Sequence, residues 1–373
     1  MKPIANWASA ESVLRVRLDA LGDVLMTTPA FAALKTSAAG RRLTLLTSSA
    51  AAAAEPLLPM IDETIVYDAP WMKAAPLRAD AGFDRAMIER LRTHRFDAAV
   101  IFTVYSQNPL PAALVCYLAD IPRRLAHARE NPYQLLTHWI PEPEPHQFVR
   151  HEVQRQLDLV AAVGAKARNV RLQVRVRPEC RALVRDRLLV AGLEMEQPWI
   201  VVHAGASAPS RRYPPEHFAA TIRILHAEHA CQVVLTGAEH ERLLVESIVA
   251  AAGVPAISLV GKTNLEELAA ILALAPIVIS NNTGPVHLAA AVGTPVVDLY
   301  APTNMQHAPW QVPHVVLYHD VPCKNCYKRI CPEGHHDCLR LLPPEAVVAA
   351  ACRLMPRKCR GGELLATSQG KED

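Results

Sequence analysis

The fold is decided by a stretch in the second half of the chain, from Ala275 to Tyr300, which reads APIVISNNTGPVHLAAAVGTPVVDLY. An apolar run at 277–280 predicts a buried strand, the polar residues 281–284 predict a tight loop, and Pro285 predicts the start of a helix. A second apolar strand is predicted at 296–300, after a Gly-Thr-Pro break. Strand, loop, helix and strand in this order make one unit of a parallel sheet, so the stretch predicts an α/β fold.

The loop inside this stretch is suited to an anion. Proline lacks an N–H, so the amides of the opening helical turn and of Gly284 face the loop. The helix dipole adds roughly half a positive charge at that end. A hydroxyl at Thr283 and an imidazole at His287, one turn into the helix, favour a ligand site over an ordinary strand-to-helix connection, which is the alternative.

Length and composition suit a protein of two domains. The 373 residues exceed one ordinary core, and we place the boundary near Pro178, which gives domains 1–177 and 178–373. A net charge of +3, without an RNA-binding, zinc-finger or basic-helix pattern, argues against a nucleic-acid partner. No apolar run reaches the ~18 residues of a membrane span, and no signal peptide is evident at the start. Nine cysteines, an odd number, fit a reducing cytoplasm, so we expect a cytoplasmic protein.

The first half alternates strands and helices, which predicts a parallel sheet with right-handed crossovers. Strands are predicted at 13–18, 43–47, 64–67 and 97–103, and helices at 23–35, in the alanine-rich segment after 47, and at 81–94. Asp23, preceded by Gly22, is therefore predicted at a helix N-terminus, at the sheet edge where ligands bind. An N-cap carboxylate is the plainer alternative for Asp23.

The second half begins again with a strand at 199–203 and the loop AGASAPSRR. Small residues, including Gly205, and two guanidinium groups, Arg211 and Arg212, precede a helix N-terminus there. Arginine forks match phosphate oxygens in pairs, so the loop predicts a diphosphate site, with solvated arginines as the alternative. The next strand ends at Thr236, and an acid after it, such as Glu241, can accept from a ribose diol.

Three further patterns have an open or structural meaning. The segment 123–177 carries ten Lys or Arg against five acids, which indicates either a solvated face or a surface for an anionic acceptor or membrane. Thr263 and Glu266 have the spacing of a capping box. The last helix, 344–354, is expected to pack back across the domains.

A cysteine cluster near the C-terminus contains half of a zinc signature. We expect no bound metal and interpret the thiols as parts of a structural loop. A metal site is the alternative, and its ligands would be Cys323, Cys326, Cys331 and Cys338.

Five motifs together resemble the ADP-heptose:lipopolysaccharide heptosyltransferases, glycosyltransferase family 9. They are VLRVRLDALGDVLMTTPAFAALK, HAGASAPSRRYPPEHFA, VVLTGAEHE, LVGKTNLEELAAILA and ISNNTGPVHLAAAVGTPVVDLYAPT. The resemblance covers nearly the whole chain from Val13 onward, with residues 70–180 the least distinctive.

The resemblance implies a GT-B fold, in which two Rossmann-like domains with parallel sheets face a central cleft. It implies an acceptor held by the first domain and a nucleotide sugar, ADP-heptose, held by the second. Transfer would invert the anomeric configuration without a metal or other cofactor, and the chain indeed has no Asp-x-Asp pair. The acceptor would be a lipopolysaccharide core or similar anionic glycolipid, with peripheral contact to the inner membrane.

The resemblance also assigns roles to residues. Asp23 matches the catalytic base, and Arg17, with Gly22, lies nearer the acceptor. Donor contacts are expected from Gly205, Arg211, Arg212, Thr236, Glu241, Asn282, Thr283, Gly284, Pro285 and His287. The family commonly has an aspartate where this chain has Asn282, which leaves open another nucleotide sugar. A GT-B-shaped nucleotide-sugar epimerase and a non-catalytic binder are further alternatives.

Overall fold

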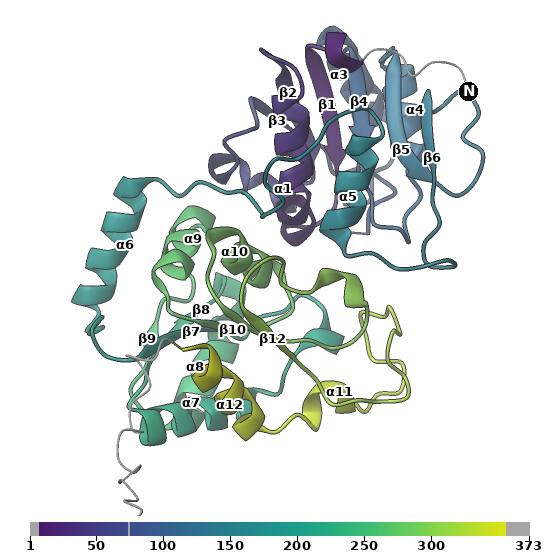
Figure 1. The fold of residues 1–373 in the computed structure, drawn as a ribbon. Helices are drawn as coiled ribbons and strands as arrows, with labels where there is room; N and C mark the ends of the chain where they lie inside the picture. The colour runs from purple at the N-terminus through teal and green to yellow at the C-terminus, as the bar shows by residue number, and fades with distance from the viewer. Residues whose placement is uncertain (1–6, 74, 356–373) are drawn as a thin grey trace, which may run out of the picture. The chain divides into compact units, whose positions relative to one another are not determined.

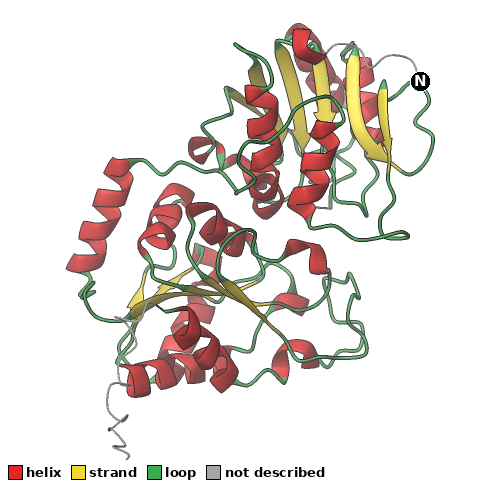
Figure 2. Cartoon of the chain, viewed as in Figure 1, coloured by secondary structure: helices red, strands yellow, loops and turns green. Residues whose placement is uncertain are grey.

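The computed structural model describes residues 7–73 and 75–355. The chain divides into two compact units, each with its own sheet (Figure 1). Unit 1 extends to Arg177 and also contains two short later segments, 290–293 and 304–311; unit 2 is the rest of the chain from Pro178. Figure 2 shows that each unit is a layered α/β structure with helices beside a sheet.

Unit 1 has a six-stranded parallel sheet in the order β3-β2-β1-β4-β5-β6. Its strands are β1 Ser12–Arg17, β2 Arg42–Thr47, β3 Glu63–Val66, β4 Ala98–Ile101, β5 Arg123–Ala128 and β6 His138–Pro141. Almost all residues of β1, β2, β4 and β5 are buried, as expected of strands that are covered on both faces.

Helices cover both faces of this sheet (Figure 1). The helical segments assigned to unit 1 are η1 Trp7–Ser9, α1 Leu21–Thr36, α2 Ser49–Ala52, η2 Glu55–Leu57, α3 Gly82–Thr93, α4 Leu110–Leu118, α5 Glu152–Ala161 and, from the later segment, η5 Met305–His307. α1 packs on α5, and α3 packs on α4. The alanine-rich helix expected after 47 is thus only four residues long, because Pro56 follows within the next turn.

Unit 2 repeats the topology of unit 1. Its sheet is parallel throughout, with the order β12-β11-β10-β7-β8-β9. Its strands are β7 Trp199–His203, β8 Gln232–Thr236, β9 Ile257–Ser258, β10 Val278–Asn281, β11 Val296–Leu299 and β12 His314–Leu317. Counted within each unit, both sheets have the strand order 3-2-1-4-5-6 of the Rossmann fold.

The last helix of unit 2 contributes to the core of this unit. The helices of unit 2 are α6 Pro178–Val190, η3 Pro209–Arg211, α7 Pro215–His229, η4 Glu239–Glu241, α8 Arg242–Ala252, α9 Leu265–Leu274, α10 Gly284–Val292, α11 Asp337–Arg340 and α12 Pro344–Leu354. α12 packs against α7 and β11, and its Val347 and Ala351 join the core of this unit. These contacts lie within unit 2, and packing of the helix back on the first domain stays a prediction.

Three helix starts differ from expectation by one or two residues. α1 begins at Leu21, before Asp23, and α10 begins at Gly284, before Pro285. The cap of α9 is Asn264, whose side chain accepts from the Glu267 amide, so the expected Thr263–Glu266 capping box was wrong by one residue.

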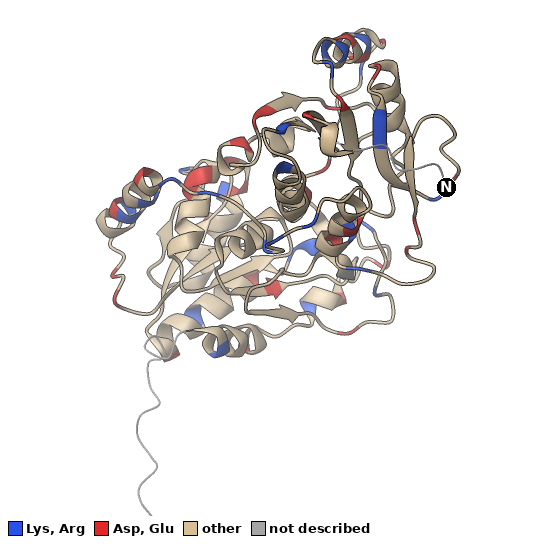
Figure 3. Ribbon diagram, turned by 45° about the horizontal axis from the view of Figure 1, so that its top comes forward, with Lys and Arg blue, Asp and Glu red and all other residues tan. Residues whose placement is uncertain are grey.

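Charged residues lie mainly outside the sheets, and helices such as α3 and α6 carry both signs (Figure 3). No helix in the described part of the chain is long and apolar enough to cross a bilayer. The first six residues, part of the stretch in which we saw no signal peptide, lie outside the described residues.

Candidate active site

The first part of the candidate site is the turn from β1 into α1. Asp23 is the third residue of α1, and its Oδ2 accepts from the amide of Ala20, the actual N-cap, at 3.2 Å. Asp23 is therefore not the N-cap residue itself but reaches back to it, which satisfies a free amide of the first turn. Gly22 is buried beside it, while 19% of the Asp23 side chain stays exposed.

Arg17, the last residue of β1, holds three carboxylates together. Its Nε lies 3.1 Å from Asp19, and its Nη2 lies 3.2 Å from Asp23 and 2.9 Å from Glu152. Burial lowers the pKa of Arg17, but the three carboxylates outweigh burial and raise it above its usual value. The guanidinium is therefore a permanent positive charge, fixed against Asp23.

The other two carboxylates are shielded from solvent. The side chains of Asp19 and Glu152 are 7% and 0% exposed, and burial raises the pKa of Glu152 to about 6 despite Arg17. Burial likewise raises the pKa of Asp19, against the charge of Arg17 and a hydrogen bond from Gln107. Asp23 is thus the carboxylate of this cluster that is most exposed to solvent.

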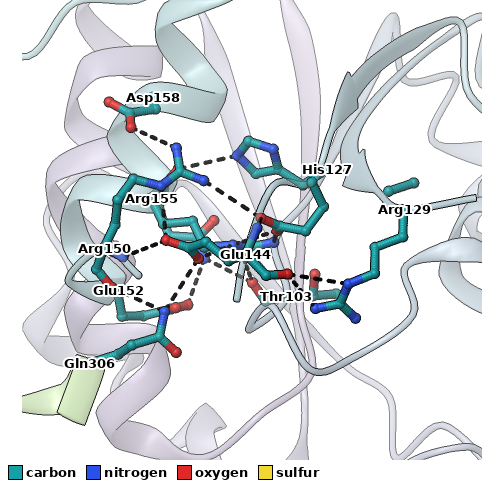
Figure 4. Close-up of polar contacts among 12 residues, drawn as sticks. Thr103, His127, Arg129, Glu144, Arg150, Glu152, Arg155, Asp158 and Gln306 are labelled. Carbon is teal, nitrogen blue, oxygen red and sulfur yellow. Dashed lines mark hydrogen bonds and ion pairs between the residues drawn. The ribbon is translucent and has the colours of Figure 1, made fainter. Parts of the chain in front are cut away.

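A network of buried ion pairs and hydrogen bonds extends from Glu152 of this cluster into unit 1 (Figure 4). Glu152 accepts from Gln156 at 2.6 Å, and Gln156 and Arg155 both donate to the carbonyl of Thr103. Arg155 also donates from Nε to Glu142 at 2.8 Å. The cluster around Arg17 is therefore one end of a continuous polar network.

Glu144 is the centre of the rest of this network (Figure 4). It is fully buried and accepts from Arg150 Nε at 3.0 Å and from Gln306 Nε2 at 3.3 Å. Arg150 also donates to Asp158 at 2.8 Å. Much of the positive charge of segment 123–177 is therefore internal, which neither of our two interpretations of that segment anticipated.

The basic residues of the segment that remain exposed are concentrated at its end. Residues 166–177 contain five Lys or Arg and no acid, and all five are exposed. Gln173 anchors this strip, since its amide donates to the hydroxyl of Thr28 on α1 at 2.9 Å.

The second part of the candidate site lies at the strand ends of unit 2. Glu241 accepts from the amide of Ala238 at 2.8 Å, and its carboxylate packs over Gly205. A Cβ on Gly205 would lie 1.9 Å from Glu241 Oε1, so only glycine leaves room for the acid. The two expected donor residues are thus brought into direct contact.

His203 links Thr236 to the same acid. Its Nδ1 lies 3.1 Å from Thr236 Oγ1, and its Nε2 lies 3.9 Å from Glu241 Oε2. Burial lowers the pKa of His203, although Glu241 acts in the opposite direction. A neutral imidazole therefore lies between the two predicted residues, with its hydrogen bond to Thr236.

Asn281 connects two loops by hydrogen bonds. One is the loop 204–212, which we call the arginine loop, and the other is the loop 281–284, which we call the donor loop. Asn281 accepts from the amide of Tyr213 at 3.0 Å and donates to the carbonyl of Ala204 at 2.7 Å. Arg212 donates to the carbonyl of Ala206 and is exposed, whereas Arg211 is half-buried and its charge acts on Asp298. The two arginines therefore have different surroundings.

The donor loop leads directly into α10. Thr283 donates from its hydroxyl to the carbonyl of Asn281 at 3.2 Å, and Gly284 and Pro285 form the first turn. His287 is buried one turn further on. Asn282 is buried and donates to Asp298, which the sequence reasoning missed.

The cysteine-rich segment packs beside the arginine loop. Its four cysteines line one pocket together with Ser210, and Ser210 bonds to the carbonyls of Lys328 and Arg329. Burial raises the pKa of Cys338 to about 11. The Sγ of Cys323 lies 3.9 Å from Nε2 of His335. Within the described residues, no three His, Cys, Asp or Glu side chains are arranged to hold a metal ion.

Four polar residues of the site were not identified from the sequence: Asp19, Glu152, His203 and Asp298. Asp19 and His203 end or follow strands, as the identified residues do, so their positions were a usable signal. A lone acid within the apolar strand 296–300 was a signal for Asp298. Glu152 left none, because it lies on α5, far along the chain from Arg17.

Comparison with known proteins gives consistent results. A model described as glycosyltransferase family 9 (heptosyltransferase) matches residues 85–336, a range that excludes Arg17 and Asp23. Lipopolysaccharide heptosyltransferase 2 of Salmonella typhimurium is 26% identical over 344 residues, 88% of this chain and 94% of that protein.

Solved structures of heptosyltransferases share the fold. E. coli ADP-heptose LPS heptosyltransferase II has a TM-score of 0.71 at 22% identity and covers 92% of this chain and 98% of its own. E. coli heptosyltransferase WaaC with ADP-2-deoxy-2-fluoro heptose has a TM-score of 0.63 at 20% identity, covering 90% and 97%. The two six-stranded sheets are those of a GT-B fold, as the sequence predicts.

Proposed function

Since the chain belongs to glycosyltransferase family 9, the heptosyltransferases, we propose that it transfers a heptose from ADP-heptose to a lipopolysaccharide core or similar glycolipid. The transfer inverts the anomeric centre and needs no metal. The observation that carries this proposal is the Arg17 cluster, in which one carboxylate, Asp23, is partly exposed at a helix N-terminus.

Asp23 acts as the general base. It takes the proton of an acceptor hydroxyl while the hydroxyl oxygen attacks the anomeric carbon of the donor sugar. The bond from that carbon to the diphosphate oxygen breaks, and the diphosphate leaves with the electron pair. Attack from the face opposite the leaving group inverts the centre, and the ion pair with Arg17 holds the base in place.

Unit 2 binds the donor. Arg211 and the amides at the start of α10 supply positive charge to the diphosphate, while Glu241 accepts from the ribose diol. The close packing of Glu241 over Gly205 and its hydrogen bond from the Ala238 amide support this role, because both fix the carboxylate. Arginine and helix ends can stabilise a leaving diphosphate without a cation.

The acceptor is an anionic glycolipid met at the cytoplasmic face of the inner membrane. The exposed strip 166–177, with five cations and no acid, supports this part of the proposal. Its anchor to α1 at Thr28 connects it to the helix that carries Asp23. A second candidate donor is another nucleotide sugar. It is favoured by Asn282, a neutral residue where the family commonly has an aspartate.

Calorimetry with ADP, UDP and GDP, and their sugars, with and without Mg²⁺, tests the donor. We expect preference for ADP-heptose independent of Mg²⁺, followed by transfer to a deacylated core acceptor with inversion at the anomeric carbon. Preference for UDP or GDP, or an absolute need for the cation, would refute the proposed donor. Binding without transfer or epimerisation would indicate a non-catalytic binder.

A further inference from the structure

Two carboxylates share one nitrogen of Arg17. Nη2 of this guanidinium lies 3.2 Å from Oδ1 of Asp23 and 2.9 Å from Oε1 of Glu152. Each acid is in the first turn of its helix, Asp23 in α1 and Glu152 in α5, and the two helices pack on each other. Asp19 lies beside a different nitrogen, Nε, at 3.1 Å. Glu152 is therefore the acid that is joined to Asp23 through a single nitrogen atom.

Glu152 is costly to bury as an anion. Its side chain is 0% exposed, whereas that of Asp23 is 19% exposed. Gln156 donates to Oε1 at 2.6 Å, which favours the anion, but Oε2 accepts no hydrogen bond from the described residues. Burial raises the pKa of Glu152 to about 6; Asp23 acts in the same direction, and Arg17 and Arg155 act against it. Glu152 is therefore ionised at pH 7.5 and mostly protonated at pH 5.

We propose that Glu152 is a positioning residue of the transfer reaction, whose negative charge offsets that of Arg17 while Asp23 accepts the proton; this rests on the proposed function. The proton of the acceptor hydroxyl neutralises Asp23, so the step loses the attraction between this carboxylate and the guanidinium. Ionised Glu152, held at the same nitrogen, repels Asp23 and makes the net attraction that is lost smaller. Ionised Glu152 therefore speeds the step, and protonated Glu152 slows it.

The test is the ratio of kcat between the wild type and Glu152→Gln, measured at two pH values. Glutamine can still accept from Arg17 but carries no charge, as protonated glutamate does. We expect the wild type to be about tenfold faster at pH 7.5 and less than about threefold faster at pH 5. The Kd of ADP-heptose should be equal in both proteins, since the proposed donor contacts are in unit 2. A purely structural loss would lower kcat by the same factor at both pH values.

A second variant moves the titration of Glu152 instead of removing it. Gln156→Met removes the hydrogen bond that favours the Glu152 anion, while Arg155 still donates to the carbonyl of Thr103. The pKa of Glu152 should rise, so kcat should reach its upper plateau about one pH unit higher than in the wild type. The plateau itself should stay within about threefold of the wild type. The shift should be absent from the double variant Gln156→Met/Glu152→Gln.

Glu142→Gln is the matched control. Glu142 is also a shielded carboxylate of this network, 3% exposed, but it accepts from Arg155 and not from Arg17. The variant should lower the melting temperature, and its kcat relative to the wild type should be the same at pH 5 and pH 7.5.

Two results would overturn the inference and leave Glu152 a structural residue. One is a kcat ratio for Glu152→Gln that does not change with pH, and the other is an unshifted pH profile in Gln156→Met. If Glu152→Gln does not fold, the profile of Gln156→Met decides. If the wild type transfers no sugar, the proposed function fails and the inference fails with it, whereas a constant ratio in an active enzyme refutes the inference alone.

Discussion

The first strand of each unit ends in a loop of opposite chemistry. After β1, the polar groups are Asp19 and Asp23, gathered by Arg17. After β7, they are Arg211 and Arg212, beside small residues. The two sheets have the same strand order, so topology gives both loops the same place at a sheet edge, and the residues of each loop determine whether acids or arginines gather there.

The lengths of the two loops explain how each chemistry is achieved. Three residues, 18–20, connect β1 to α1, whereas eleven, 204–214, connect β7 to α7. The loop of three contributes only Asp19 to the cluster, so the strand end supplies Arg17 and the helix supplies Asp23. The longer loop forms a 3-10 turn that presents its own arginines.

Removing the base tests the acceptor side of this comparison most strongly. We expect Asp23→Asn to lower kcat by about 10³-fold, because general-base catalysis contributes about 10²–10⁴. The Kd of the donor should stay unchanged, since the proposed donor contacts are in unit 2. Steady-state transfer assays and calorimetry measure the two quantities.

Asp19→Asn is the matched control for this variant. It also removes a carboxylate from Arg17, but a shielded one, so kcat should fall less than about tenfold. Equal losses in both variants would mean that the cluster as a whole, and not Asp23, is required.

Arg211→Ala tests the donor side. We expect the Kd of ADP to rise about 30-fold, because charge-assisted bonds to phosphate contribute about 1.5–3 kcal/mol. Arg212→Ala should raise it less than about threefold, since Arg212 is exposed and already bonded to the Ala206 carbonyl. Calorimetry of both variants measures the difference, and a reversed order would exchange the two assignments.

The sequence predicted the sheets because their strands are continuous apolar runs bounded by Gly, Pro and polar residues. It singled out Asp23 and the loop 281–284 as candidates because both lie where strands end or helices begin, whereas Arg17 came from the family resemblance; their roles stay predictions. Glu152 and the network around Glu144 could not be predicted, since they join segments through tertiary packing. Prediction of the α9 cap failed because Thr263-Asn264 and Glu266-Glu267 satisfy the same pattern in two registers, and the structure buries Glu266.

Glu152 tests how the acceptor cluster responds to pH. Its pKa is raised by burial from 4.5 to about 6, so the folded protein keeps a proton that the unfolded chain has lost. Stability should therefore fall as pH rises through this window, by about 2 kcal/mol relative to Glu152→Gln. Urea unfolding of both proteins at pH 4 and pH 6.5 measures this.

Glu196→Gln is the control, because Glu196 is an exposed carboxylate in unit 2. Its unfolding free energy should differ from the wild type by the same amount at both pH values. A Glu152→Gln variant that behaves in this way would show that burial does not disfavour the Glu152 charge.

Gly205 gives the smallest expected effect and the finest distinction between the two loops. Alanine at 205 places Cβ 1.9 Å from the Glu241 carboxylate, so this acid must move and its proposed ribose contact should weaken. We expect the Kd of ADP to rise about fivefold, less than one full hydrogen bond to a charged group. At Gly237 the nearest Glu241 oxygen is 3.1 Å away, so Gly237→Ala should change the Kd less than about twofold. Equal effects at the two glycines would show that general strain near β8, and not displacement of Glu241, reduces binding. The proposed contact of Glu241 with the ribose would then be refuted.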